Sequence, residues 1–368
     1  MKINVSNATF SSIVGIGQKV KKAAKESGEM YLELNRGVNA VTQIDLHEIK
    51  EQINFNTKDF QVYAPNLGIE SFRKAIAQEY FPSNAQDGFE ANIAITPGGM
   101  PALDLVIQLL NVETIYFPKF YWGSYSKMAT IRHKMFSFYD GLEQFETTHL
   151  NDSSCVFICD PSNPTGIKLD DDFLYSSIEK ITKTGAIVIF DSPYRKLFTD
   201  DNFFDKLAKL DNLVITESFS KWVGLSGLRM GFIFCKNKAF NSELNIRLLY
   251  EFNGVSTAPQ IIIEKIITTQ EGRKALDVFR KTTRENIAKN IEYLQKNNLL
   301  VKEMYDDSKP LGIFAVITKA EDYLFQHKIG AVGMDKFVYH DRDFWSSYSR
   351  ICVSVEHEIF KQFISKII

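Results

Sequence analysis

The sequence has few cysteines and histidines and no excess of charge of either sign. It contains 4 Cys and 6 His in 368 residues, without a CxxC pair or a Cys/His cluster at metal-ligand spacing. The 43 Lys and Arg stand against 45 Asp and Glu, and the net charge of -2 leaves no surplus of cations for phosphate backbones or anionic membranes. We therefore expect no metal site, no nucleic-acid partner and no membrane partner.

Long apolar runs are also missing. The longest ones span a few residues, far below the roughly 20 that cross a bilayer, and the N-terminal stretch MKINVSNATF lacks the apolar region of a secretory signal. Cys155 and Cys159 lie in one apolar run that is typical of a buried strand, and unpaired buried thiols suit a reducing compartment. These features predict a soluble protein of the cytoplasm.

What is present is the composition of a globular chain, with 45% hydrophobic and 24% charged residues. At about 150 residues per domain, the length predicts two domains. Apolar residues at helical spacing predict helices over 11–27 and 69–80. Short apolar strands that alternate with helical stretches predict a largely parallel sheet covered on both faces, with strands at 92–96, 114–117, 155–159, 186–190, 213–216 and 231–235.

The pattern changes near residue 259, where a long amphipathic helix begins. Strands are predicted after it at 313–318 and 350–355, which indicates a second, smaller α+β domain. We expect residues 1–36 to form an N-terminal arm and part of the small domain, 37–262 the large domain, and 263–368 the small C-terminal domain.

Several predicted strands end in polar residues, and ligands of parallel sheets bind at the carboxyl ends of the strands. DPSNPTG follows 155–159, DSPY follows 186–190, ESFSK follows 213–216, and TPGGM precedes a helix. Each motif alone has an ordinary interpretation, as a turn, a helix cap, a solvated lysine or a helix start. Their occurrence together at successive strand ends of one sheet indicates a binding site.

In this order the motifs resemble those of the fold type I pyridoxal-phosphate (PLP) enzymes, specifically the class I and II aminotransferases of the aspartate aminotransferase superfamily. SFSKWVGLSGLRMG is similar to the signature S-x-S-K-x-x-x-x-x-G-x-R-x-G, and FPKFYWGSY to P-K-x-x-W-G-N-H. YAPNLGIESFRKAIA, the segment TFSSIVGIGQKVKKAAKESG and YSRICVSV are similar to further family segments, so the resemblance runs from about residue 9 to residue 356. It implies an α/β fold, with a mostly parallel seven-stranded sheet flanked by helices and a smaller α+β domain.

The resemblance also implies a PLP-dependent aminotransferase that moves an amino group between an L-amino acid and a 2-oxo acid. Lys221 would be the catalytic residue, which forms a Schiff base with the cofactor aldehyde and then performs the 1,3-proton shift. An amine does both when its pKa lies near neutrality. Asp191 would keep the pyridine nitrogen protonated, Tyr194 and Asn163 would hydrogen-bond the phenolate oxygen, and Trp122 would stack on the ring.

The cofactor phosphate, a dianion, needs several donors. Backbone N–H groups at a helix start supply some of them, and the family often has a hydroxyl residue where this chain has Met100. The donors implied by the resemblance are the backbone at Gly99 and Met100, the side chains of Ser218, Ser220 and Arg229, and Tyr63 from the partner subunit of a homodimer with shared active sites.

Arg350 would clamp the α-carboxylate of the substrate with its two-pronged guanidinium group. Asn163 and the backbone at Gly37 would complete that pocket. Arg247 is a candidate for reading a second carboxylate, at a position where the aspartate enzymes keep an arginine.

Two alternatives remain open. The same scaffold supports PLP-dependent lyases of the β-lyase type and decarboxylases, because the cofactor performs the difficult step. A non-catalytic sensor domain is the other alternative, and the presence of Lys221, Asp191 and Arg229 argues against it.

Overall fold

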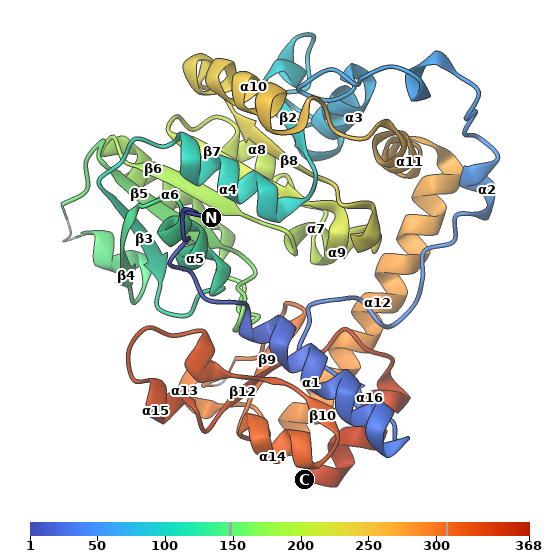
Figure 1. Cartoon of the computed structure of the whole chain (residues 1–368), viewed down its shortest axis with the longest axis vertical. Helices are drawn as coiled ribbons and strands as arrows, with labels where there is room; N and C mark the ends of the chain where they lie inside the picture. The colour runs from blue at the N-terminus through green and yellow to red at the C-terminus, as the bar shows by residue number, and fades with distance from the viewer. Residues whose placement is uncertain (147–148, 307) are drawn as a thin grey trace.

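The computed structural model describes residues 1–146, 149–306 and 308–368. The chain forms a larger part around a seven-stranded sheet and a smaller part around short strands and helices, and the two lie one above the other in Figure 1. The predicted α/β fold is confirmed. The domain boundaries stay a prediction.

The strands of the larger sheet follow the order β2-β8-β7-β6-β5-β3-β4. β8 runs antiparallel to both of its neighbours, and all other pairs are parallel. The six predicted strands are present with small shifts at their ends, whereas the edge strand β4 was not predicted. The bounds are β2 (Ile93–Thr96), β8 (Gly231–Cys235), β7 (Leu213–Ser218), β6 (Ile187–Asp191), β5 (Ser154–Cys159), β3 (Thr114–Pro118) and β4 (Met135–Tyr139).

Helices cover both faces of this sheet because successive strand residues point to opposite sides. In β5, Val156 and Ile158 belong to one hydrophobic core, while Cys155 and Phe157 belong to the other. The first core is completed by α3 (Glu70–Tyr80), α6 (Asp171–Lys183) and α8 (Phe203–Leu207), and the second by α4 (Gly99–Leu109), α5 (Ser124–Ile131) and α10 (Lys238–Phe252).

The smaller part combines both ends of the chain. β1 (Leu32–Glu33) pairs in parallel with β10 (Ile329–Gly330), and α1 (Ser12–Ser27) crosses this part in Figure 1. An antiparallel sheet has the order β11-β12-β9, with bounds Val332–Gly333, Ser349–Cys352 and Phe314–Ile317. Helices of the C-terminal region are α13 (Lys302–Tyr305), α14 (Glu321–Gln326), α15 (Arg342–Trp345) and α16 (His357–Ile364). Two short helices elsewhere in the chain are α2 (His47–Lys50) and α7 (Arg195–Phe198).

The single long helix predicted from about residue 259 is wrong. The structure has two helices, α11 (Thr257–Thr268) and α12 (Gln270–Lys296), with Thr269 in an extended conformation between them. The Thr269 hydroxyl accepts a hydrogen bond from the Gly272 amide at 3.2 Å, so this residue ends one helix and caps the next. In the described part of the chain, no helix is both long and apolar enough to span a bilayer.

Candidate active site

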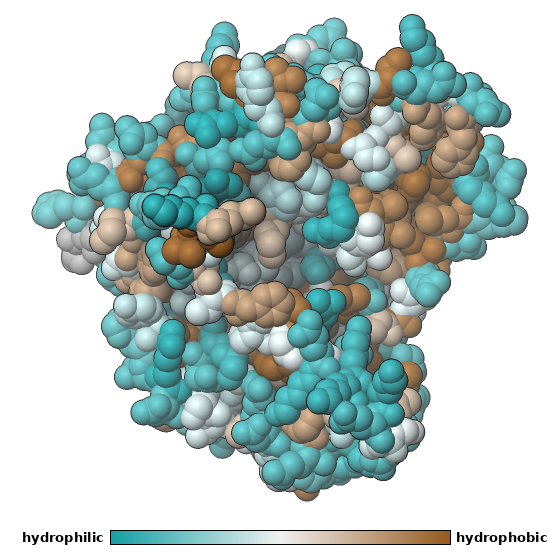
Figure 2. Space-filling model, in the orientation of Figure 1, coloured by the Kyte–Doolittle hydropathy of each residue, from teal (hydrophilic) through white to brown (hydrophobic). Residues whose placement is uncertain are grey.

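The polar strand ends meet in one pocket between the two parts of the molecule, with a volume of about 360 Å³. It lies at the carboxyl ends of β5, β6 and β7, beside the start of α4, and Figure 2 shows a recess in this central region. All of the predicted site residues except Tyr63 and the candidate Arg247 line it, namely Gly37, Gly99, Met100, Trp122, Asn163, Asp191, Tyr194, Ser218, Ser220, Lys221, Arg229 and Arg350. The structure thus brings the predicted set together, and the individual roles stay predictions.

Lys221 lies on the short helix α9 (Phe219–Trp222), which directly follows β7. Its side chain is half-buried, and its Nζ donates a hydrogen bond to the carbonyl oxygen of Gly37. Burial lowers the pKa of Lys221 to about 8, and the positive charges of Arg229 and Arg350 act in the same direction. About a tenth of the amine is therefore unprotonated at pH 7, and this is the form that a base or a nucleophile requires.

Asp191 is the last residue of β6 and is buried. The Tyr125 hydroxyl donates to Oδ2, and the Thr216 hydroxyl donates to Oδ1 at 3.2 Å. Burial raises the pKa of Asp191 to about 6, while the two hydrogen bonds oppose the rise. The carboxylate is thus mostly ionised at neutral pH. The sequence reasoning missed Tyr125, although it follows Trp122 by three residues, nearly one helical turn.

The start of α4 forms a cradle for an anion. Gly98 has a φ of 111°, and a Cβ built there would lie 2.6 Å from a guanidinium nitrogen of Arg229. A Cβ on Gly99 would lie 3.1 Å from the Cβ of Ser218, whose hydroxyl donates to Ser220 at 3.0 Å. The first N–H groups of a helix have no partner within the helix. These groups therefore surround a position suited to a phosphate.

Arg350 lies on β12 with its guanidinium group fully buried. It donates to Asn163 Oδ1 at 3.2 Å and to the carbonyl oxygen of Asn35, and the Asn163 amide in turn donates to the Tyr194 hydroxyl at 3.4 Å. Its Nε has no partner among the described residues. Burial lowers the pKa of Arg350 to about 10, so the group stays cationic at neutral pH and attracts an anion.

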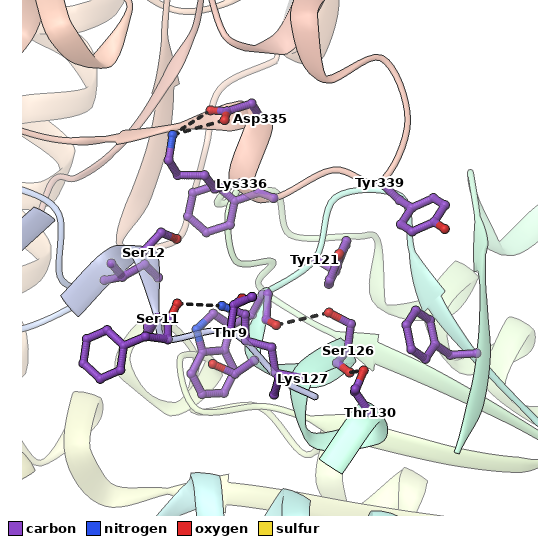
Figure 3. Close-up of a pocket in the computed structure, with 18 of the residues that line it drawn as sticks. Thr9, Ser11, Ser12, Tyr121, Ser126, Lys127, Thr130, Asp335, Lys336 and Tyr339 are labelled. Carbon is purple, nitrogen blue, oxygen red and sulfur yellow. Dashed lines mark hydrogen bonds and ion pairs between the residues drawn. The ribbon is translucent and has the colours of Figure 1, made fainter. Parts of the chain in front are cut away.

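A second pocket of about 360 Å³ adjoins the first and is drawn in Figure 3. Trp122 and Ile13 line both pockets. In Figure 3, Ser11 and Ser12, at the N-cap and the first position of α1, lie between Lys336, whose amine points to Asp335, and Lys127 of α5. The N-terminal segment 7–13 therefore contributes to the wall beside the candidate active site.

Two candidate residues lie outside the first pocket. The Tyr63 side chain is 83% exposed and does not line the pocket of its own chain. Arg247 donates to Glu243 of α10 at 2.9 Å and to Gln108 of α4 at 2.8 Å. Its guanidinium group therefore has partners within the protein and does not line the pocket. Among the described residues, no group of three or more His, Cys, Asp or Glu side chains is placed to hold a metal ion.

The family comparison identifies the kind of enzyme to which this pocket belongs. The sequence profile described as "Aminotransferase class I and II" matches residues 29–367. The chain belongs to this family. The predicted resemblance and the predicted aminotransferase function are confirmed at that level.

Relatives of this aminotransferase include histidinol-phosphate and aspartate enzymes. The chain is 26% identical to histidinol-phosphate aminotransferase 2 of Archaeoglobus fulgidus over 62% of its length and 63% of that enzyme. It is 25% identical to the histidinol-phosphate aminotransferase of Pyrococcus furiosus over 76% of this chain and 82% of that enzyme. It is 23% identical to the aspartate aminotransferase of Pyrococcus horikoshii over 74% of this chain and 69% of that enzyme.

Solved structures share the fold at low sequence identity. The aspartate aminotransferase of Thermus thermophilus with maleate superposes with a TM-score of 0.82 and 15% identity, covering 100% of this chain and 99% of that one. The protein MJ0684 of Methanococcus jannaschii superposes with a TM-score of 0.82 and 17% identity, covering 100% of this chain and 99% of that one. At such identities the likeness establishes the fold alone.

Proposed function

We propose that this aminotransferase binds PLP and uses Lys221 to move an amino group between an L-amino acid and a 2-oxo acid. The observation that carries the proposal is one pocket that joins an amine with a lowered pKa, a buried carboxylate and an anion cradle. Lyases on the same scaffold would use the same three groups, so the experiment below separates the two outcomes.

The residues present fit the cofactor. The cradle of Gly98, Gly99, Ser218 and Arg229 would hold its phosphate, because a Cβ at either glycine would come within 3.1 Å of Arg229 or Ser218. Asp191, held by two hydroxyl donors, would lie against the pyridine nitrogen. When bound, PLP supplies an aldehyde that takes up the amino group and a ring that accepts the electrons released at the substrate Cα.

The side chains of the pocket would transfer the proton, bind the substrate and contact the cofactor ring. Lys221 would provide the amine that attaches to the cofactor and would later carry the proton from the substrate Cα. Arg350 would bind the α-carboxylate with a bidentate fork, which fixes the Cα–H bond next to Lys221. Trp122, at the pocket wall, would pack on the ring, and Tyr194 and Asn163 would hydrogen-bond the phenolic oxygen.

We further propose a homodimer in which Tyr63 reaches the phosphate of the partner's site. Its side chain is 83% exposed, and exposed apolar side chains gather on the same segment at Phe55 and Val62. This segment meets the end of α10, because a Cβ on Gly254 would lie 2.6 Å from the Ala64 carbonyl oxygen. Tyr250 at that end is also 83% exposed, so both segments present aromatic side chains to a second copy.

A cytoplasmic location is part of the proposal. The four cysteines are free, and three of them are buried, as suits a reducing compartment.

The test is cofactor fixation followed by a screen of amino donors. Borohydride should fix PLP covalently to the wild-type chain and to Lys183→Ala, an exposed lysine paired with Glu179 at 2.9 Å, but not to Lys221→Ala. Mass spectrometry locates the adduct. Single amino acids should then convert the bound cofactor to its amine form without release of ammonia. Fixation on Lys221→Ala would contradict the assignment, and release of pyruvate and ammonia would identify a lyase.

A further inference from the structure

The charges that line the pocket are strongly unequal. Four cationic side chains surround it, Lys221, Arg229, Arg350 and Arg36, whereas Asp191 is the only acid among the described residues that line it. Under the proposed function, Lys221 bonds to the cofactor aldehyde, Arg229 faces the phosphate, and Arg350 takes the α-carboxylate. Arg36 is left without an anion.

Arg36 has no partner within the described part of the chain. Its side chain is exposed, and its guanidinium group makes neither a hydrogen bond nor an ion pair with a described residue. A guanidinium group in a concave site gains most from a planar anion, which it binds with two parallel hydrogen bonds. An unpaired arginine at the wall of a substrate pocket therefore has capacity for a ligand.

The backbone on both sides of Arg36 is tied to the groups that would perform the reaction. The carbonyl oxygen of Asn35 accepts a hydrogen bond from Arg350, and the carbonyl oxygen of Gly37 accepts one from Lys221. Gly37 also packs closely on Phe314, since a Cβ there would lie 2.5 Å from the ring. The backbone at Arg36 is thus held between the amine of Lys221 and the guanidinium group of Arg350. The positive charge of Arg36 also contributes to lowering the pKa of Lys221.

The cations of the adjoining pocket and Arg247 are already bonded within the protein, and Arg342 of that pocket donates to the Val338 carbonyl oxygen at 3.4 Å. In the adjoining pocket, Lys336 donates to Asp335 at 3.0 Å and pairs with Glu321 at 3.2 Å, and Lys127 donates to a backbone carbonyl oxygen at 3.2 Å (Figure 3). Arg247, the candidate from the sequence, is bound to Glu243 and Gln108 and does not line the pocket.

We propose that Arg36 binds a second anionic group on the amino donor, so that this enzyme prefers acidic donors with a carboxylate or a phosphate on the side chain. The inference rests on the proposed function and deepens it, because it assigns the substrate class and the residue that selects it.

The test compares acidic donors with neutral donors of matched shape. Glutamate is paired with glutamine, aspartate with asparagine, and O-phosphoserine with serine, and the carboxylate and phosphate arms show which anion is used. Wild-type enzyme should prefer at least one acidic donor over its neutral match. Arg36→Met should lower kcat/KM for that donor about 10- to 100-fold, as loss of a charge-assisted hydrogen bond does, and change the value for the neutral donor less than about 3-fold.

A binding measurement gives a readout independent of turnover. By calorimetry, succinate should bind the holoenzyme more tightly than butyrate, and Arg36→Met should remove this difference while Arg36→Lys keeps part of it. Arg247→Met is the matched control and should leave both the donor preference and the binding difference unchanged.

Three results would overturn the proposal: equal rates and binding for acidic and neutral ligands in the wild-type enzyme, a preference that survives Arg36→Met, or a preference lost in Arg247→Met. Failure of every donor to react would instead contradict the proposed function. In that case the succinate and butyrate measurements still decide whether Arg36 binds a second anion.

Discussion

Tyr125 of α5 donates its phenolic hydrogen to the Asp191 carboxylate at the end of β6, and both side chains are buried. This bond joins a helix that covers one face of the sheet to the carboxyl end of a central strand. It stabilises the ionised form of Asp191 against the rise in pKa that burial causes.

We predict that Tyr125→Phe shifts the acid limb of the activity–pH profile to higher pH. The tyrosine lowers the pKa of Asp191, so its removal leaves the carboxyl protonated to a higher pH than the present value of about 6. The profile of kcat/KM for one donor, measured from pH 5 to 9, gives the shift. Tyr139→Phe is the control, because that buried hydroxyl donates to the Phe157 carbonyl oxygen at 2.7 Å and not to Asp191. An unmoved acid limb in Tyr125→Phe would contradict the prediction.

Arg350→Ala should weaken the binding of amino acids by on the order of 2–5 kcal/mol, the cost of losing one partner of a buried charge pair. Amines without a carboxylate should bind nearly as in the wild type, because the clamp has nothing to hold in them. Dissociation constants of alanine and ethylamine, followed by the cofactor absorbance, measure both effects. The control is Arg273→Ala, an arginine on α12 bonded to Glu79 at 3.2 Å. Equal losses for the two ligands would show that Arg350 does not select the carboxylate.

Glu217 allows a prediction about stability and pH. Glu217 lies near the end of β7 with its side chain buried, where Oε1 accepts from the Ser218 amide at 2.8 Å and Oε2 has no partner among the described residues. Burial raises the pKa of Glu217 well above its ordinary value, although the positive charge of Lys196 opposes the shift. Above the unfolded pKa, the folded state therefore holds a proton that the unfolded state has released, and folding loses stability as the pH rises.

Glu217→Gln removes this titration, so the free energy of unfolding should rise relative to wild type as the pH increases. The gain is small near pH 4 and grows by up to about 1.4 kcal/mol per pH unit while one proton separates the two states. Urea denaturation at pH 4, 6 and 8 measures it, with the exposed Glu303→Gln as control. A difference that is constant or falls with pH is the result that would refute the prediction.

Subunit mixing tests the shared site. Tyr63→Ala should weaken PLP affinity, and Lys221→Ala should abolish covalent attachment. In mixed dimers, one site pairs the intact Lys221 of the first variant with the intact Tyr63 of the second, so high-affinity attachment should return at that site. Tyr323→Ala, an exposed tyrosine on α14 away from the proposed dimer face, is the control and should keep its cofactor affinity. An active monomer in sedimentation, or no recovery on mixing, would count against a shared site.

The sequence could place part of the candidate site in one region because several of its residues belong to contiguous motifs at strand ends. Lys221, Asp191 and Asn163 each follow an apolar run, and the carboxyl ends of parallel strands necessarily meet at one edge of a sheet. That argument needs only the strands and their order along the chain.

The sequence alone could not predict contacts that depend on the order of the strands in space. Tyr125 and Asp191 are 66 residues apart and meet because α5 packs on the face beside β6. The position of Arg36 depends on β1, a two-residue strand that pairs with β10 almost 300 residues later. The edge strand β4 did carry a signal, since Phe136 and Phe138 alternate with polar or exposed positions.

The bonds from Lys221 to Gly37 and from Arg350 to Asn35 have a consequence for affinity. The backbone of the loop 35–37 accepts from the donors that the cofactor and the substrate would use in the proposed reaction, so the loop competes with both ligands. Each ligand must exchange an existing hydrogen bond for its own, and the measured affinity is the difference between the two.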